Sequence, residues 1–176
     1  MKNILKSYGL DENSLIQPLT SGLINKTLKV SDGKNNYVLQ QININVFKNP
    51  HQLAENITMM DQYLKVHHPE YLFVAPVTNI ENTTLYLDKE QGYFRLFRFI
   101  EGSHTIDVAD TAEQAFEAAY QFGKFTRLLS GFDATRLHTT IPDFHNLTLR
   151  YKQFENALKN GNAERIKQSR DLIKII

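Results

Sequence analysis

The sequence contains no cysteine among its 176 residues. This absence excludes disulfide bridges, thiolate zinc sites and cysteine nucleophiles. Long apolar runs are also missing, and none approaches the roughly eighteen residues that a membrane-spanning helix needs. The opening stretch MKNILKSYGLDEN lacks the long apolar core of a secretory signal and reaches acidic residues early. These absences predict a soluble, cytoplasmic protein without a membrane partner.

The sequence has no excess of charge of either sign. It contains 20 Lys and Arg against 19 Asp and Glu, and its formal net charge is +1. The basic residues are scattered rather than grouped, so we expect no nucleic-acid partner. A hydrophobic content of 41% with 22% charged residues is ordinary for a globular protein. The length suits one domain, or two small lobes, with a sizeable core.

Several catalytic motifs are missing as well. The sequence has neither a Walker loop nor G-x-G-x-x-G, and no G-x-S-x-G supports a serine hydrolase. It also lacks His-x-Asp-x-x-x-x-Asn, Asp-x-Asp and Asp-Phe-Gly. Phosphoryl transfer needs a carboxylate base and ligands for magnesium. We therefore assign no catalytic residue and no metal ligand to this chain.

The first half of the chain is predicted to be rich in strands. We expect a short opening helix in KNILKSYGL and then three antiparallel strands in SLIQPL, KTLKV and NYVLQQINI, with Asp32-Gly33 as a hairpin turn. An amphipathic helix is predicted over residues 50–66, with Pro50 in its first turn. TTLYL and GYFRLFRFIEG are predicted as two further strands, the second covered on both faces.

The pattern changes to helical after Gly102. We expect helices in DTAEQAFEAAYQFGKFTRLLSG, DFHNLTLRYKQFENALKNG and AERIKQSRDLIKII, so residues 1–101 and 102–176 form two lobes of an α+β protein. The last of these helices ends on an apolar pair without a capping residue. A natural C-terminus and truncation within a longer fold explain this ending equally well.

Gly22 lies in a short polar loop, residues 20–25, between the first two predicted strands. A glycine there lets backbone amides approach a phosphate, and Thr20 and Ser21 add hydroxyl donors. A hairpin loop that needs glycine for its backbone angles is the alternative. The order of elements favours the phosphate loop, because strand, loop, two strands, helix, two strands and a helical half is the order of a protein-kinase-like N-lobe.

In that arrangement the segment YVLQ takes the place of the strand that carries a phosphate-pairing lysine. The position holds Gln40, or Gln41 if the register slips by one. Glutamine brings no charge, and a charge-assisted hydrogen bond contributes about 1.5–3 kcal/mol against about 1 for a neutral one. Another cation is therefore expected to help, with Lys26 and Lys29 as candidates nearby. Glu55 on the inserted helix is either the partner that orients the third-strand side chain or a solvent-facing residue.

Three other sets of residues are candidates for binding. The segment 97–102, FRFIEG, is either an adenine-binding hinge built on Phe99, Ile100 and Glu101 or a covered strand followed by a turn. His145 precedes a predicted helix and is a candidate for substrate binding. The arginines are candidates for anion binding, although each has an ordinary ion pair as the alternative; they are Arg95, Arg98 and Arg150.

The segments LTSGLINKTLKV, YVLQQININVFKNP, YFRLFRFIEG and TIPDFHNLTLR resemble the aminoglycoside phosphotransferase-like kinases. They are most similar to the branch of N-acetylhexosamine 1-kinases, which phosphorylate the anomeric hydroxyl of free sugars with ATP and magnesium. The resemblance covers residues 10–150 and implies a protein-kinase-like N-lobe, a sheet of about five antiparallel strands and one helix, followed by the first helices of a helical C-lobe. The family's catalytic loop and magnesium-binding motif lie further on, so the resemblance also implies that the chain is an N-terminal portion, inactive without the missing C-lobe.

The resemblance also implies roles for individual residues. The nucleotide-binding set would be Thr20, Ser21, Gly22, Leu23, Ile24, Asn25, Gln40, Glu55, Phe99, Ile100 and Glu101, with ATP as cofactor. Two alternatives stay open at this point. The chain is either a kinase of another small substrate, such as an aminoglycoside, choline or homoserine, or a non-catalytic pseudokinase-like module that binds a nucleotide, a sugar or a protein partner.

Overall fold

The computed structural model describes residues 1–19 and 22–175. Its contacts divide the chain into two compact units, Met1–Thr140 and Ile141–Ile176, which are described separately below. The first unit holds the sheet and the long helices α2 and α3, and the second holds short helical segments. The predicted boundary between two lobes near residue 101 stays a prediction.

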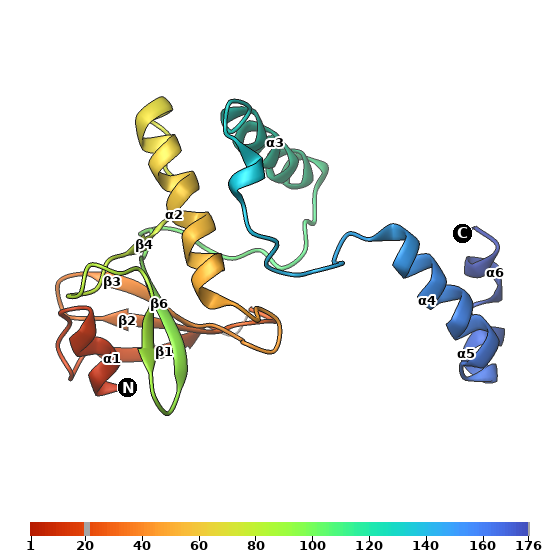
Figure 1. The fold of residues 1–176 in the computed structure, drawn as a ribbon, viewed down its shortest axis with the longest axis horizontal. Helices are drawn as coiled ribbons and strands as arrows, with labels where there is room; N and C mark the ends of the chain where they lie inside the picture. The colour runs from red at the N-terminus through yellow and green to blue at the C-terminus, as the bar shows by residue number, and fades with distance from the viewer. Residues whose placement is uncertain (20–21, 176) are drawn as a thin grey trace. The chain divides into compact units, whose positions relative to one another are not determined.

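One antiparallel sheet forms the centre of the first unit (Figure 1). Its strands are β1 (Leu15–Leu19), β2 (Lys26–Ser31), β3 (Asn36–Gln41), β4 (Pro76–Val77), β5 (Tyr86–Asp88) and β6 (Gly92–Arg98). The order is β1-β2-β3-β6-β4, and β5 also pairs with β6. The predicted meander and the predicted hairpin are confirmed. Strand β4 was not predicted, because two residues are too short to show a periodic pattern.

The hairpin turns follow from local chemistry. Gly33 has φ +88° at the turn between β2 and β3, a conformation that side chains with a Cβ rarely adopt. Asp32 Oδ1 accepts hydrogen bonds from the backbone N–H of Lys34 at 2.8 Å and of Asn35 at 2.7 Å, which closes the turn. These bonds also hold the pKa of the Asp32 carboxyl below its usual value.

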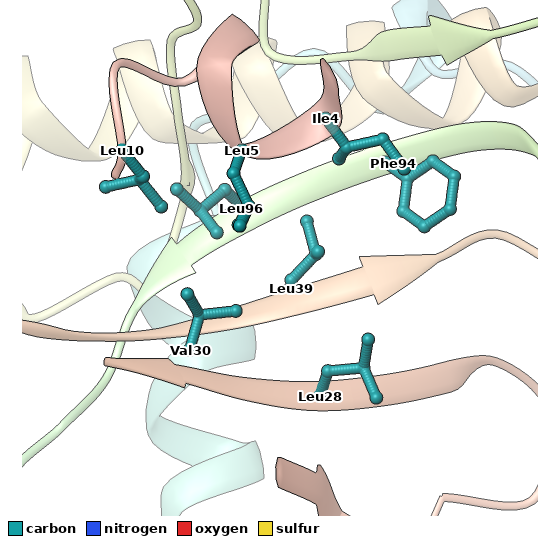
Figure 2. Close-up of a cluster of buried hydrophobic side chains, with 8 residues drawn as sticks. All are labelled: Ile4, Leu5, Leu10, Leu28, Val30, Leu39, Phe94 and Leu96. Atoms are coloured by element: carbon teal, nitrogen blue, oxygen red, sulfur yellow. The ribbon is translucent and has the colours of Figure 1, made fainter. Parts of the chain in front are cut away.

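The hydrophobic core lies between one face of the sheet and helix α1 (Lys2–Ser7). Figure 2 shows the side chains of α1 directed towards those of β2, β3 and β6. The core members are Ile4, Leu5, Leu10, Leu28, Val30, Leu39, Phe94 and Leu96. In β6 only Phe94 and Leu96 are buried, so the prediction that this strand is covered on both faces is wrong. The opposite face of the sheet is only partly covered, and it carries the polar side chains described below.

Two long helices complete the first unit. Helix α2 (Pro50–His67) begins after Asn49, whose side chain accepts a hydrogen bond from Gln52 N at 3.2 Å, and Pro50 occupies the first turn as predicted. Helix α3 (Ala112–Leu128) begins in the same way after Thr111 and is followed by the short 3-10 helix η1 (Ala134–Arg136). Across the described ranges, no helix is long and apolar enough to cross a membrane.

The second unit contains α4 (Leu147–Asn160), α5 (Ala163–Gln168) and α6 (Arg170–Ile173). The single helix predicted for AERIKQSRDLIKII is wrong, because the chain breaks at Ser169, where φ is −93° and ψ is 6°. Neither short helix buries a described residue. Helices this short are marginal without packing to hold them, so the amphipathic pattern overstated their continuity.

Candidate nucleotide-binding face

The open face of the sheet carries a row of polar side chains across three strands. The register pairs Thr27 of β2 with Gln40 of β3, and Gln40 with Arg95 of β6. Directly paired residues of antiparallel strands point to the same face. The neighbouring row, Leu28, Leu39 and Leu96, belongs to the core, so the polar row points away from it. Gln40, rather than Gln41, is therefore paired with these polar groups.

Hydrogen bonds join this row into a chain. Arg95 Nε and Nη2 both donate to Gln40 Oε1, at 2.9 and 2.6 Å. Gln40 Nε2 donates to Thr27 Oγ1 at 3.3 Å, and Thr27 Oγ1 donates to the carbonyl of Asn25 at 3.4 Å. The amide of Gln40 is thus oriented from both sides. The chain of bonds connects β6 to the end of the glycine loop.

Thr20 and Ser21 of the predicted phosphate loop lie outside the described residues. The rest of the loop is tied to the start of the segment after β3. Asn25 Oδ1 accepts from Asn43 N at 2.9 Å, and Asn43 Nδ2 donates to the Ile24 carbonyl at 3.2 Å. Leu23 is 99% exposed.

Gly22 has room for a side chain as far as the described atoms are concerned. A Cβ there would lie 3.4 Å from the Asn25 carbonyl oxygen and 3.5 Å from Thr27 Oγ1, which is close to ordinary contact. Crowding within the loop therefore gives only a weak reason for glycine at this position. The same geometry places Gly22 beside Thr27, at the end of the polar row.

The predicted hinge continues from β6. Phe99 N donates to the Asn36 carbonyl at 3.0 Å, and Asn36 Nδ2 donates to Glu101 Oε1 at 2.8 Å. The Lys29 ammonium lies 4.2 Å from the centroid of the Phe99 ring, a cation–π contact. Lys29, one of the two predicted helper cations, is thus engaged at the hinge rather than in the row of Thr27, Gln40 and Arg95.

The structure gives Glu55 a partner other than the third strand. Glu55 Oε2 lies 2.8 Å from His138 Nε2, and the neighbouring Asn56 forms two hydrogen bonds with the backbone of His138. Gln40 takes its partners from Thr27 and Arg95 instead. The expected pairing of Glu55 with the third-strand side chain is therefore not formed here, and a nucleotide-binding role for Glu55 stays a prediction.

The predicted residues line separate hollows rather than one pocket. Glu55 lines a groove of about 920 Å³ between α2 and the strands, together with Thr58, Met59, Tyr86, Tyr93 and His138. Ile24 lines another cavity, of about 370 Å³, with Lys26. Ile100 lines a third, of about 730 Å³, on the other side of α2. The described chain therefore offers a face with a loop and a hinge, not a closed cavity.

The described residues do not form a metal centre by themselves. Within residues 1–19 and 22–175, no group of three or more His, Asp or Glu side chains could hold an ion. These residues do not fit a magnesium ion by themselves, and we derive no step through one. His145, the candidate for substrate binding, lies exposed in the second unit, where its ring meets that of Phe144 edge to face at 4.8 Å.

The sequence did not single out Thr27 as a member of the polar row, and it offered Arg95 only as one of three candidates for anion binding. The alternation in KTLKV could have placed Thr27 opposite the core once Leu28 was taken as buried. The pairing of Gln40 with Arg95 spans 55 residues and depends on β6 lying beside β3. That neighbour relation is decided by the sheet order, which no local pattern contains.

Comparisons with known proteins agree with this fold. The sequence model of the phosphotransferase enzyme family matches residues 15–175. A structure of spectinomycin phosphotransferase with ADP and spectinomycin is similar with a TM-score of 0.58 at 14% identity, covering 98% of this chain and 53% of that chain. The AMP-bound complex of the same enzyme has a TM-score of 0.59 at 12% identity, with the same coverage. A microcompartment-associated aminopropanol kinase has a TM-score of 0.53 at 17% identity, covering 81% of this chain and 42% of that chain. The chain thus spans about half the length of these proteins, and the α+β fold matches their N-terminal half.

Proposed function

The chain belongs to the phosphotransferase enzyme family, and we propose that it is the nucleotide-binding part of a small-molecule kinase that transfers the γ-phosphate of ATP to a sugar hydroxyl. The proposed substrate is an N-acetylhexosamine, phosphorylated on its anomeric hydroxyl in the cytoplasm. This substrate rests on the resemblance of the segments LTSGLINKTLKV and YVLQQININVFKNP to N-acetylhexosamine 1-kinases. The remaining half of the enzyme would supply the catalytic carboxylate and the magnesium ligands.

One observation carries the proposal. The hydrogen-bonded row Thr27, Gln40 and Arg95 lies on the open face of the sheet, next to the end of the glycine loop. Kinase-like folds hold the nucleotide phosphates with a glycine-rich loop and a side chain of the third strand.

The hinge would hold the adenine through its backbone. The Phe99 N–H and the Ile100 carbonyl are already engaged, with the Asn36 carbonyl and with Ser103 N at 3.1 Å. The proposed acceptor for adenine is therefore the Phe99 carbonyl, and the proposed donor is the Glu101 N–H. The Ile100 N–H belongs to the same trans peptide as the Phe99 carbonyl and points the opposite way. Val38, on the same face of the sheet, would provide an apolar surface for the purine ring.

Turnover by the full-length protein tests the proposal. With ATP and magnesium present, we expect the protein to form ADP when N-acetylglucosamine or N-acetylgalactosamine is added. The matched control is the methyl glycoside of the same sugar, which has no free anomeric hydroxyl and should give only the background rate. Turnover on spectinomycin, choline or homoserine but on neither sugar would replace the sugar with another substrate.

A full-length protein that binds ATP without phosphorylating any of these compounds would support the non-catalytic alternative. Failure to bind ATP at all would refute the nucleotide-binding assignment itself. His145 is proposed to contact the substrate, and H145A should then raise KM for the sugar more than KM for ATP.

A further inference from the structure

Arg95 is a partly buried cation without a counter-ion in the described part of the chain. None of the ion pairs formed by residues 1–19 and 22–175 includes it. Its Nε and Nη2 donate to the neutral oxygen of Gln40, and its Nη1 is buried with no hydrogen-bond partner among the described residues. The ring of Phe97 lies 5.1 Å from the guanidinium carbon and packs against it.

Such an arrangement is unfavourable unless an anion completes it. A buried charge loses its hydration, and a neutral amide oxygen returns only part of that loss. Burial lowers the pKa of the Arg95 guanidinium, but arginine keeps its charge at neutral pH because its usual pKa lies far above neutral. The guanidinium fork matches the oxygens of a phosphate in geometry and charge.

The position of Arg95 points to the same ligand. Arg95 stands directly beside Gln40 in the register, on the face away from the core. Gln40 holds the place at which related kinases carry a lysine, and it holds Arg95 through two hydrogen bonds. Thr27 links this pair to the end of the glycine loop. Arg95, on the neighbouring strand β6, therefore brings a positive charge beside Gln40, whose own side chain is uncharged.

We infer that Arg95, oriented by Gln40, is the residue that binds the ATP phosphates in place of the missing lysine. Gln40 is then a positioning residue, since it acts through Arg95. This inference rests on the proposed nucleotide-binding function and adds the cation to it. Lys29 is not that cation, because its ammonium lies on the ring of Phe99 at the hinge.

Titrations of the full-length protein with ATP, ADP and adenosine test this role. Arg95→Gln should weaken ATP and ADP binding roughly ten- to a hundredfold, as expected for the loss of charge-assisted bonds. Adenosine, which has no phosphate, should bind R95Q as it binds the wild type. The matched control is Lys89→Gln, which removes an exposed charge from the turn between β5 and β6 and should leave ATP affinity unchanged.

Gln40→Glu tests the same role without removing Arg95. The new carboxylate oxygen would take the position now 2.6 Å from Arg95 Nη2, and it would neutralise the guanidinium within the protein. We expect Q40E to melt no lower than the wild type and yet to bind ATP more weakly. If R95Q fails to fold, this variant decides alone.

The outcomes separate the two proposals. If the wild type binds ATP and both R95Q and Q40E bind it as tightly as K89Q does, the inference is overturned and the nucleotide-binding function stands. If the wild type binds neither ATP nor ADP, both are overturned. Equal loss of adenosine and ATP by R95Q would assign Arg95 a structural role and would also overturn the inference.

Discussion

Removing the side chain of Asn56 should loosen helix α2 from the segment that follows α3. Asn56 Nδ2 donates to the His138 carbonyl at 2.8 Å, and Asn56 Oδ1 accepts from His138 N at 2.9 Å. The two residues are 82 positions apart, so the pair of bonds joins distant parts of the first unit. Glu55, whose carboxylate lies 2.8 Å from His138 Nε2, depends on the same attachment.

The size of the effect follows from the geometry. An intramolecular hydrogen bond contributes about 1 kcal/mol net, and two bonds contribute about 2 kcal/mol. His138 is exposed, so its released backbone groups reach water and add no desolvation cost. For a chain of 176 residues this loss corresponds to a fall in melting temperature of about 5 °C. Asn56→Asp should lose less, because aspartate keeps the acceptor for His138 N.

The assay combines thermal unfolding with hydrogen exchange of the His138 amide. N56A should melt lower than the wild type, and this amide should exchange faster. The control is Asn45→Ala, because the exposed Asn45 side chain forms no hydrogen bond with another described residue. If N56A and N45A melt together and the His138 amide exchanges at the wild-type rate, Asn56 does not hold this segment and the reasoning is wrong.

Three further predictions concern the glycine loop, the core and the turn between β2 and β3. Gly22→Ala should weaken ATP binding about tenfold, because a methyl group would stand where backbone amides approach the phosphate. The control is Gly33→Ala, at φ +88°, which should cost about 1 kcal/mol of stability and leave ATP affinity unchanged. Leu39→Ala, at a core position that is 0% exposed, should lower the free energy of unfolding in urea by about 2–5 kcal/mol. The control is Leu23→Ala, at a 99% exposed position, and equal stability of the two variants would contradict the assignment of Leu39 to the core. The lowered pKa of Asp32 stabilises the fold above the usual carboxyl pKa, and this stabilisation is lost as pH falls through the lowered value. Asp32→Asn should therefore lose less melting temperature in acid than the wild type. If the two proteins lose melting temperature equally as pH falls, the Asp32 carboxylate does not stabilise the turn.

Local chemistry determined much of this fold from the sequence alone. Asp32-Gly33 fixes the turn between β2 and β3 because an aspartate side chain and a glycine at positive φ close it without help from distant residues. Asn49-Pro50 starts α2 for the same kind of reason, since the cap acts only on the first helical turn. The alternation of apolar residues also identified the strands whose leucines form the core.

The predictions that failed depend on partners far away in the sequence. The amphipathic pattern after residue 162 predicted one helix, but no buried described residue holds that helix together at Ser169. Glu55 was either the partner of the third-strand side chain or a solvent-facing residue from sequence, and the structure places its carboxylate 2.8 Å from His138 Nε2.

The sequence by itself showed a glutamine at residue 40, where the resemblance to kinases implies a lysine, and so predicted that a cation would come from elsewhere. Only the tertiary structure decided which cation lies against Gln40. Strand β6 pairs with β3 across 55 residues and places Arg95, not Lys26 or Lys29, against Gln40. The physical reason is the sheet register: a shift of one residue would turn Arg95 into the core and Leu96 towards the open face.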